Sequence, residues 1–302
     1  MKNKILYIIS IILFFIAVIS FNVNVKTNFI WPKKPIKKEM TISVLINGNI
    51  KTLSLEEYVV GVVAGEMPAS FNIEALKAQA IASRTYALYH KNNGKNTLTN
   101  TIDDQVYIER EEMINKWGSS YENYYNKIKN AVNDTKGLIM TYNGEIIESF
   151  YFSMSSGYTQ NSVDVFKENI EYLVSVPSEY DNSSINNFEV KKTFNNEEFK
   201  NILQLNCGEI VINNIIYNDN HYIKTIEICN KVFDGNEFRN ILKLRSADFT
   251  IDINDNILIT TRGYGHGVGM SQYGANGYAN NGYNYEEILK HYYKNIEIIS
   301  IN

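Results

Sequence analysis

The chain of 302 residues has little cysteine, little tryptophan and a small net charge. Its two cysteines, Cys207 and Cys229, form no Cys-x-x-Cys pair and no cluster with histidine, which argues against a structural zinc site of the usual spacing. They could form one disulfide or stay as two buried thiols, and we favour the thiols. The formal net charge of −4 gives no reason to expect a nucleic-acid partner. No internal repeat at a fixed period is visible either.

The rest of the composition is that of a folded protein. Hydrophobic residues make up 44% of the chain and charged residues 21%, and the length suffices for one large domain or two smaller ones. The chain has 22 tyrosines. Tyrosine-lined clefts suit ligands with an apolar face and many hydroxyls, such as sugars, although tyrosine also packs well in cores.

An uncharged apolar run over residues 5–21 is close to the length that spans a bilayer. It is longer than a usual signal-peptide core and no small-residue cleavage site follows, so we predict a cytoplasmic stub and transmembrane anchor over residues 1–22. A cleaved signal peptide is the alternative. Residues 23–39, with two prolines and several lysines, indicate a linker. Lysines lie on both sides of the span, so the positive-inside rule does not decide its orientation.

The stretch from Ser54 to Pro68 predicts a short helix that ends on a glutamate. Ser54 and Glu57 have the spacing of a capping box, so the helix should begin at Leu55. Pro68 disfavours helix at the preceding residue, which places Glu66 in the last turn, on the side of the apolar stripe. Burial and the negative end of the helix dipole both raise the pKa of a carboxyl group, which makes it a useful general acid. The alternative is a boundary glutamate whose carboxylate reaches water.

Hairpin and helix patterns along the chain predict an α+β fold, with mixed helices and antiparallel strands around a large cleft. Turns at Asn47-Gly48 and Asn143-Gly144 indicate two hairpins, over residues 40–53 and 138–152. Residues 92–118 are polar and are expected to form a loop. Further helices are predicted at residues 72–90, 122–135 and 285–293.

Asparagine-rich turns set residues 182–249 apart from the rest. They separate two short helices and two strands, so we predict a smaller α+β subdomain inserted into a main domain of residues 40–181 and 250–302. The helices are expected near residues 197–203 and 237–244, and the strands at 209–217 and 222–229.

Three polar stretches supply candidate binding residues. The first is the helix over residues 72–90, whose side chains could reach a ligand or could instead cap loops and pair with acids. The second is the hydroxyl-rich loop 153–161, where self-capping turns are the alternative to sugar binding. The third is the segment 262–275, in which glycine alternates in a way that lets a ligand or another backbone come close. The candidates are Gln79, Arg84, Ser156, Thr159, His266, Ser271, Gln272 and Tyr273.

Together, several motifs resemble those of the stage II sporulation protein D (SpoIID) family, which is related to LytB-type amidase enhancers. The resemblance extends from about residue 40 to the C-terminus. The motifs are Leu55–Pro68, Ala75–Tyr86, Tyr172–Pro177 and Gly263–Ala275, with a weaker one formed by Gly235–Arg239 and Leu244–Ser246.

The resemblance implies a lytic transglycosylase that cuts peptidoglycan glycan strands during forespore engulfment, with Glu66 as the catalytic acid. It implies as partners the wall amidase SpoIIP and the membrane protein SpoIIM. Because the wall lies outside the membrane, the catalytic domain should lie outside too, on a single-pass anchor in the engulfing septal membrane.

One carboxyl group suffices for this chemistry. Ordinary glycosidases need two, whereas a lytic transglycosylase can use the MurNAc 6-hydroxyl of its substrate as the nucleophile, which leaves a 1,6-anhydro end. Some relatives carry histidine and cysteines near the position of Phe152 that bind zinc, and this chain has no cysteine there. We therefore predict no metal and no cofactor. The alternatives to the enzyme are a non-catalytic glycan-binding protein that stimulates an amidase and a structural anchor of an engulfment complex.

Overall fold

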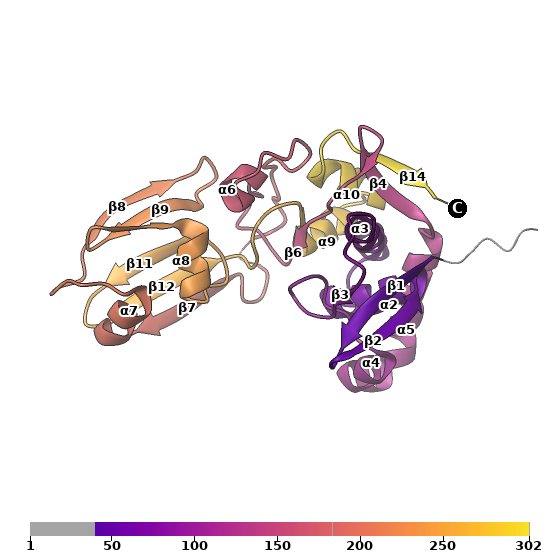
Figure 1. Ribbon diagram of the computed structural model, residues 1–302, viewed down its shortest axis with the longest axis horizontal. Coiled ribbons are helices and arrows are strands. Elements are labelled where there is room, and N and C mark those ends of the chain that lie inside the picture. Colours follow the sequence, from indigo (N-terminus) through magenta and orange to yellow (C-terminus); the bar gives the residue numbers. More distant parts are fainter. Residues whose placement is uncertain (1–39, 183, 302) are drawn as a thin grey trace, which may run out of the picture. The chain divides into compact units, whose positions relative to one another are not determined.

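The computed structural model describes residues 40–182 and 184–301, which form helices and mostly antiparallel strands (Figure 1). This confirms the α+β class. No helix in these two ranges is long and apolar enough to cross a membrane. The predicted anchor over residues 1–22 and the linker over residues 23–39 lie outside the described residues.

The N-terminal part of the fold follows the sequence prediction closely. Strands β1 (Thr41–Ile46) and β2 (Asn49–Ser54) form the expected hairpin, and Ile46 pairs with Asn49 across the turn. Strand β3 (Leu98–Thr99) joins β1 in parallel. Helix α2 (Leu55–Glu66) follows β2 directly.

Helix α3 (Ile73–Asn92) lies at the centre of the main core. Its N-terminus is capped by the side chain of Asn72, as predicted. Five alanines on this helix leave room for neighbours on several sides, so α3 packs extensively against five other elements at once and also touches β5 (Glu145–Ile146). These are α2, α5 (Tyr121–Asp134), α9 (Gln272–Asn280), α10 (Tyr285–Tyr292) and β4 (Leu138–Tyr142).

The hairpin predicted over residues 138–152 is shorter than expected. Strand β4 pairs with β5 (Glu145–Ile146) across the Asn143-Gly144 turn, and β14 (Glu297–Ser300) lies on the other side of β4. The chain then leaves this sheet. Strand β6 (Tyr151–Phe152) pairs in parallel with β13 (Met270–Ser271), a contact over more than a hundred residues that local sequence patterns do not reveal.

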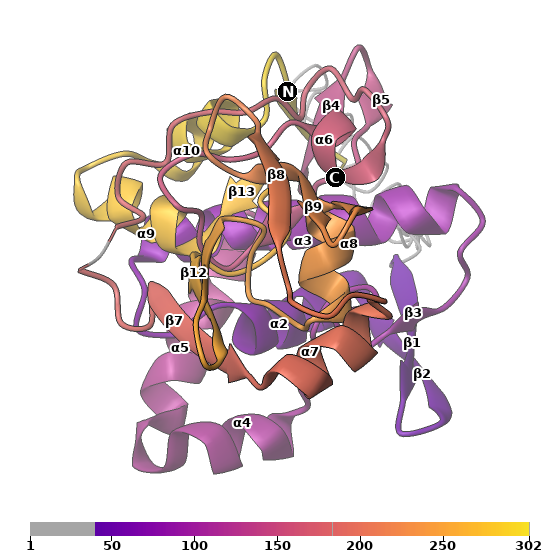
Figure 2. The ribbon, with the colours of Figure 1, turned by 90° about the vertical axis from the view of Figure 1, so that its left-hand side faces the viewer.

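A second hydrophobic core is formed by two three-stranded sheets and two helices, whose elements lie toward the viewer in Figure 2. The predicted helices and strands are all present. The core also contains Ile257 and Ile259, which lie beyond residue 249, the expected C-terminal edge of the inserted subdomain. The domain boundaries stay a prediction. The elements of this core are β7 (Glu189–Phe194), α7 (Asn196–Leu203), β8 (Ile212–Tyr217), β9 (Ile223–Ile228), β10 (Lys231–Asp234), α8 (Gly235–Ile241), β11 (Phe249–Ile253) and β12 (Ile257–Arg262).

Several helical segments were not predicted. Helix α4 (Arg110–Trp117) buries only Met113, and short helical turns lie at Gly118–Ser120 and Ser162–Phe166. Helix α9 contains glycines, which disfavour a helix interior. Tertiary packing overrides that preference, because a Cβ on Gly274 would lie 2.1 Å from the Tyr292 hydroxyl.

The interpretation of the two cysteines as buried thiols is wrong. Cys207 and Cys229 form a disulfide with their Cα atoms 6.0 Å apart. Cys207 follows α7 and Cys229 follows β9, and the backbone N–H of Cys229 donates to Val211 near the start of β8. The fold therefore brings together two positions whose spacing in the sequence gives no sign of pairing.

Replacing both cysteines with serine should lower the free energy of unfolding by about 3 kcal/mol, because the bridge closes a loop of 22 residues in the unfolded chain. Urea denaturation of the oxidised protein measures this change. The wild-type chain under reducing conditions is the matched control and should lose a similar amount. Equal stability of oxidised and reduced protein would contradict a stabilising bridge.

Candidate active site

Helix α2 ends on the candidate acid. The Ser54 side chain accepts from the backbone N–H of Glu57 and the Glu57 carboxylate accepts from the backbone of Ser54, so the predicted capping box is confirmed. The helix runs from Leu55 to Glu66, also as predicted. No basic residue of α2 itself lies in its last turn, but the Lys116 ammonium donates to the Ala64 carbonyl there at 3.0 Å and offsets part of the negative end of the helix dipole.

Two glycines on α2 let a neighbouring segment come unusually close. A Cβ on Gly61 would lie 2.1 Å from the Tyr107 ring, and one on Gly65 would lie 2.3 Å from the Val106 carbonyl oxygen. The backbone N–H of Ile108 donates to the Gly61 carbonyl at 3.2 Å. Because of this contact, the segment from residue 105 to 108 lies directly against the end of α2 and its backbone faces Glu66.

The carboxyl group of Glu66 is surrounded by hydrogen-bond donors. The backbone N–H of Val106 donates to Oε1 at 2.6 Å, and the polar ends of the Gln272 and Tyr151 side chains lie near the carboxyl group and also lower its pKa. Removal from water raises the pKa of Glu66 above the ordinary glutamate value of 4.5. The three donors and the Lys116 ammonium oppose this shift without cancelling it. The result is a carboxyl group held in place that retains its proton to higher pH.

Buried side chains fix the two side-chain donors in turn. The Gln272 amide also donates to Gln79 Oε1 at 3.4 Å, and Gln79 donates to Ser83 at 3.0 Å. The Tyr151 hydroxyl accepts from Gln105 Nε2 at 2.8 Å, which leaves its proton free for Glu66. Burial and the Glu66 charge raise the pKa of Tyr151 well above its usual range, so Tyr151 remains a donor.

His266 lies behind Tyr151. Its Nδ1 accepts from the backbone N–H of Val268 at 3.1 Å, so Nε2 carries the proton and donates to the Tyr151 carbonyl at 3.2 Å. Burial, together with the positive charge of Arg239, lowers the pKa of His266 to about 4. This histidine is therefore neutral near pH 7, and it holds the Tyr151 backbone.

Positive φ angles at alternating glycines let the loop around His266 wrap closely over β6. Gly265 has φ of 124°, and a Cβ there would lie 2.6 Å from Phe152. Gly269 has φ of 79°, and a Cβ there would lie 2.0 Å from the Phe150 carbonyl oxygen. The alternation therefore brings a second backbone close, which is one of the two uses predicted for it.

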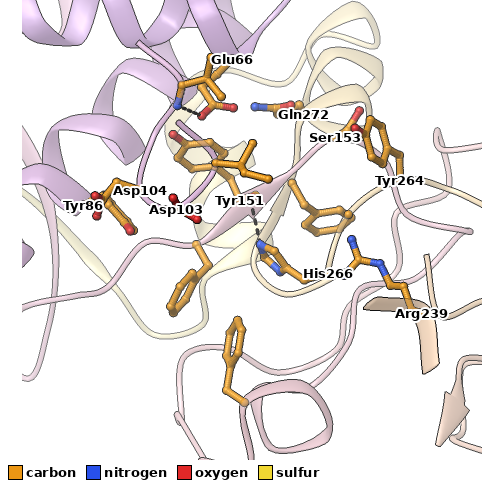
Figure 3. A pocket seen from close by; sticks show the side chains of 16 residues that line it. Glu66, Tyr86, Asp103, Asp104, Tyr151, Ser153, Arg239, Tyr264, His266 and Gln272 are labelled. Atoms are coloured by element: carbon orange, nitrogen blue, oxygen red, sulfur yellow. Dashed lines mark hydrogen bonds between the residues drawn. The ribbon is translucent and has the colours of Figure 1, made fainter. Parts of the chain in front are cut away.

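Glu66 lines a pocket of about 510 Å³ (Figure 3). Aromatic rings make up much of the wall, which suits the apolar faces of sugar rings. Of the predicted binding residues, His266 and Gln272 lie in the wall with Glu66. The other lining residues are Tyr86, Ile102, Asp103, Asp104, Val106, Phe150, Tyr151, Phe152, Ser153, Phe166, Arg239, Tyr264 and Gly265.

Two further carboxylates line this pocket, and the sequence had not singled them out. Asp104 has no exposed side-chain surface and forms a salt bridge with Lys95 at 2.5 Å. Burial opposes its ionisation, yet Lys95 and two hydrogen bonds from Thr99 hold the pKa of Asp104 below its usual range. Asp103 is exposed and accepts from Thr101. Asp104 therefore differs from Glu66 in the direction of its pKa shift, and Asp103 differs from Glu66 in its exposure.

Arg84, a candidate for ligand contact or for acid pairing, does not line the pocket. Its side chain has no exposed surface, because its guanidinium pairs with Glu56 at 2.5 Å and donates to three backbone carbonyls. This is the acid pairing that the sequence left as the alternative.

Five other candidates also lie outside the pocket lining. Gln79 is fully buried and acts on the site only through Gln272. Thr159 is buried and bonded to the Val176 backbone, and Ser271 caps α9. The remaining two are Tyr273, whose ring packs on Phe71, and Ser156, whose hydroxyl is buried.

Tyr151, Val106 and Arg239 were missed as site residues. Tyr151 and Arg239 reach the pocket through contacts between segments far apart in the chain, which local spacing does not report. Val106 did carry an indirect signal, because Gly61 and Gly65 stand four residues apart on one helix face. That spacing is typical of a helix that another backbone approaches closely.

Comparison with known proteins shows the family to which the chain belongs. A family model for the stage II sporulation protein (SpoIID) matches residues 47–142, a range that includes Glu66 and its Val106 donor. The chain is 42% identical over 262 residues to stage II sporulation protein D of Bacillus subtilis (strain 168), covering 83% of this chain and 76% of that protein. The chain belongs to the stage II sporulation protein D family. The resemblance predicted from the motifs is thus confirmed, for a family involved in sporulation.

Two other relatives show the range of the similarity. Stage II sporulation protein D of Bacillus amyloliquefaciens is 40% identical over 279 residues, covering 88% of this chain and 81% of that protein. The amidase enhancer of Bacillus subtilis (strain 168) is 27% identical over 296 residues, covering 80% of this chain but 40% of the enhancer. The second relation is distant, as expected for the LytB-type proteins.

Substituting Arg84 with glutamine should destabilise the protein by about 3 kcal/mol, because the Glu56 carboxylate would lose its partner in a largely buried position. Urea denaturation measures the change. A double variant with methionine at both positions removes both charges and should recover part of the loss. If Arg84→Gln is as stable as wild type, the buried pair does not stabilise the fold.

Proposed function

We propose that this SpoIID-family chain is a peptidoglycan lytic transglycosylase of sporulation. It would cleave the β-1,4 bond between MurNAc and GlcNAc in glycan strands and leave 1,6-anhydroMurNAc ends. The observation that carries this proposal is one carboxyl group with a raised pKa, Glu66, held by three donors in a pocket lined with aromatic rings.

Glu66 would act twice in the reaction. As the bond between C1 of MurNAc and its oxygen breaks, Glu66 gives its proton to the departing GlcNAc oxygen. The resulting carboxylate then takes the proton of the MurNAc 6-hydroxyl while that oxygen bonds to C1. No water enters the products, so the second carboxylate of an ordinary glycosidase is not required.

The donors around Glu66 suit both halves of this cycle. Desolvation keeps the acid protonated before the bond breaks. Val106, Gln272 and Tyr151 then stabilise the carboxylate once the proton has left. His266 serves as a positioning residue, since it is neutral and holds the Tyr151 backbone.

The wider setting follows from the family and from the predicted anchor. We infer a membrane-anchored protein of the engulfing septal membrane whose catalytic domain faces the wall. Its proposed partners are the amidase SpoIIP and the membrane protein SpoIIM. The main domain of residues 40–181 and 250–302 would carry the acid, and the inserted subdomain would complete the pocket.

A non-catalytic glycan-binding protein that stimulates an amidase is the second candidate function. The similarity to the amidase enhancer of Bacillus subtilis favours it. Binding and stimulation need the aromatic walls of the pocket but not a proton donor, so the two functions differ in their dependence on Glu66.

The variant Glu66→Gln should lower the release of anhydro-ended fragments by roughly 100- to 10,000-fold while retaining glycan binding, because the amide cannot donate and recover a proton as the acid does. Mass spectrometry of digests of denuded glycan strands measures the 1,6-anhydroMurNAc ends. The matched control is Glu111→Gln, which alters an exposed glutamate of α4 that does not line the pocket.

Two results would contradict the proposed lytic transglycosylase activity. The first is failure of wild-type protein to cut denuded strands while it still stimulates an amidase, which would favour the second candidate. The second is the appearance of reducing ends that take up ¹⁸O from labelled water, which would indicate an ordinary hydrolase using a second carboxylate.

The activity should fall on its basic side at a pH above 4.5, the ordinary glutamate pKa, because the working acid must be protonated and burial raises its pKa. Tyr151→Phe removes a donor that favours the ionised form, so it should move this basic limb to higher pH. Initial rates of anhydro-end formation across a range of pH locate the basic limb for the wild type and for Tyr151→Phe. A basic limb at or below pH 4.5 would contradict the role of burial.

A further inference from the structure

The motif formed by Gly235–Arg239 and Leu244–Ser246 has no part in the chemistry at Glu66. In the structure it forms α8 and the turn after it, within the second core. Arg239 extends from this helix into the wall of the same pocket that contains Glu66. In Figure 3, Arg239 lies beyond His266 as seen from Glu66.

Arg239 has the only cationic side chain in the lining of this pocket, as far as the described residues extend. It is partly buried, and no carboxylate within residues 40–182 and 184–301 forms a salt bridge with it. Burial lowers the pKa of Arg239, which reflects a charge held without compensation. A half-buried guanidinium without an acidic partner is costly, and a bound anion would offset that cost.

The hydrogen bonds of Arg239 leave part of its guanidinium free. Nε donates to the Arg245 carbonyl at 3.3 Å, and one terminal nitrogen donates weakly to Asn240 at 3.4 Å. Arginine offers five N–H donors in a planar fork that matches a carboxylate, so the free donors suit such a group.

An exposed aromatic ring, that of Tyr264, lines the same pocket as Arg239. The guanidinium of Arg245 lies 4.3 Å from the centroid of the Tyr264 ring, while 48% of Tyr264 is exposed at the pocket. Arg245 therefore supports one face of the ring. The exposed ring gives a surface on which a sugar can stack next to Arg239.

We propose that Arg239 and Tyr264 form a carboxylate-binding subsite that takes the lactyl carboxylate of a muramic acid residue in the glycan. This inference rests on the proposed glycan substrate. The carboxylate has to be close to a sugar ring, because the cation and the stacking ring line one pocket. The lactyl group meets that condition directly, whereas the carboxylates of a stem peptide lie farther along a flexible chain.

The subsite would fix the register of the strand. Muramic acid alternates with glucosamine, so only every second sugar carries the lactyl group. A single cation that accepts this group excludes a strand displaced by one sugar. The bond presented to Glu66 would then be the MurNAc–GlcNAc bond and not the GlcNAc–MurNAc bond.

Equilibrium binding of full-length protein tests the subsite without requiring cleavage. The protein carries Glu66→Gln so that the strand stays intact, and fluorescence anisotropy follows end-labelled oligosaccharides of one length. Four probes are compared: denuded GlcNAc–MurNAc strands, the same strands with every lactyl carboxylate converted to its carboxamide, strands with stem peptides, and a GlcNAc homopolymer.

Denuded strands should bind about 10-fold more tightly than the carboxamide strands, since a charge-assisted contact is lost on amidation. Arg239→Gln should weaken binding of denuded strands by a similar factor and leave the carboxamide affinity unchanged. Arg239→Lys keeps the charge and should retain part of the preference. Lys224→Gln, which alters an exposed cation of β9 outside the pocket, is the matched control.

Equal affinity of denuded and carboxamide strands for the protein with Arg239 intact would overturn the proposal, and this comparison needs no variant at that position. The proposal would also be overturned if Arg239→Gln weakened binding of the GlcNAc homopolymer as much as it weakens binding of denuded strands. Arg239-dependent binding of peptide-bearing strands at full strength would assign the cation to peptide carboxylates instead. None of these outcomes depends on anhydro products, so the subsite and the proposed reaction can fail separately.

Discussion

The close approach of the segment from residue 105 to 108 to helix α2 is the contact on which the candidate site depends. Gly61 and Gly65 make it possible, because a side chain at either position would displace the segment. The approach removes water from Glu66, which raises its pKa, and delivers the Val106 N–H, which opposes that shift. The same packing contact thus sets both the position of the acid and its affinity for a proton.

The opposite wall acts on the same carboxyl group from segments far along the chain. The pairing of β6 with β13 brings Tyr151 and Gln272 to Glu66, and the glycine-rich loop holds Tyr151 in place through His266. A neutral histidine suits this role, since a charged ring could not accept the Val268 N–H at Nδ1. Two of the motifs that suggested the family therefore meet at one functional group.

The sequence predicted those features that depend on neighbouring residues. The capping box and Pro68 placed both ends of α2 correctly, and Asn47-Gly48 placed the first hairpin. Prediction from the sequence failed where contacts between distant segments determine the structure. Helix α9 forms despite its glycines because Tyr292 and Tyr180 fill the space beside them. Likewise, Arg84 looked available for a ligand because nothing nearby in sequence showed that Glu56 would bind it.

The charges of the pocket are separated, and this has a consequence for an anionic glycan. Glu66, Asp103 and Asp104 line it together with one cation, Arg239. Asp104 is paired with Lys95, whereas the exposed Asp103 would repel the carboxylates of a glycan strand and Arg239 would attract them. A substrate with a negative group on alternate sugars then has one favourable register, and a neutral polymer has none. Selection of the bond to be cut would thus depend on a residue of the second core, while the proton comes from the first.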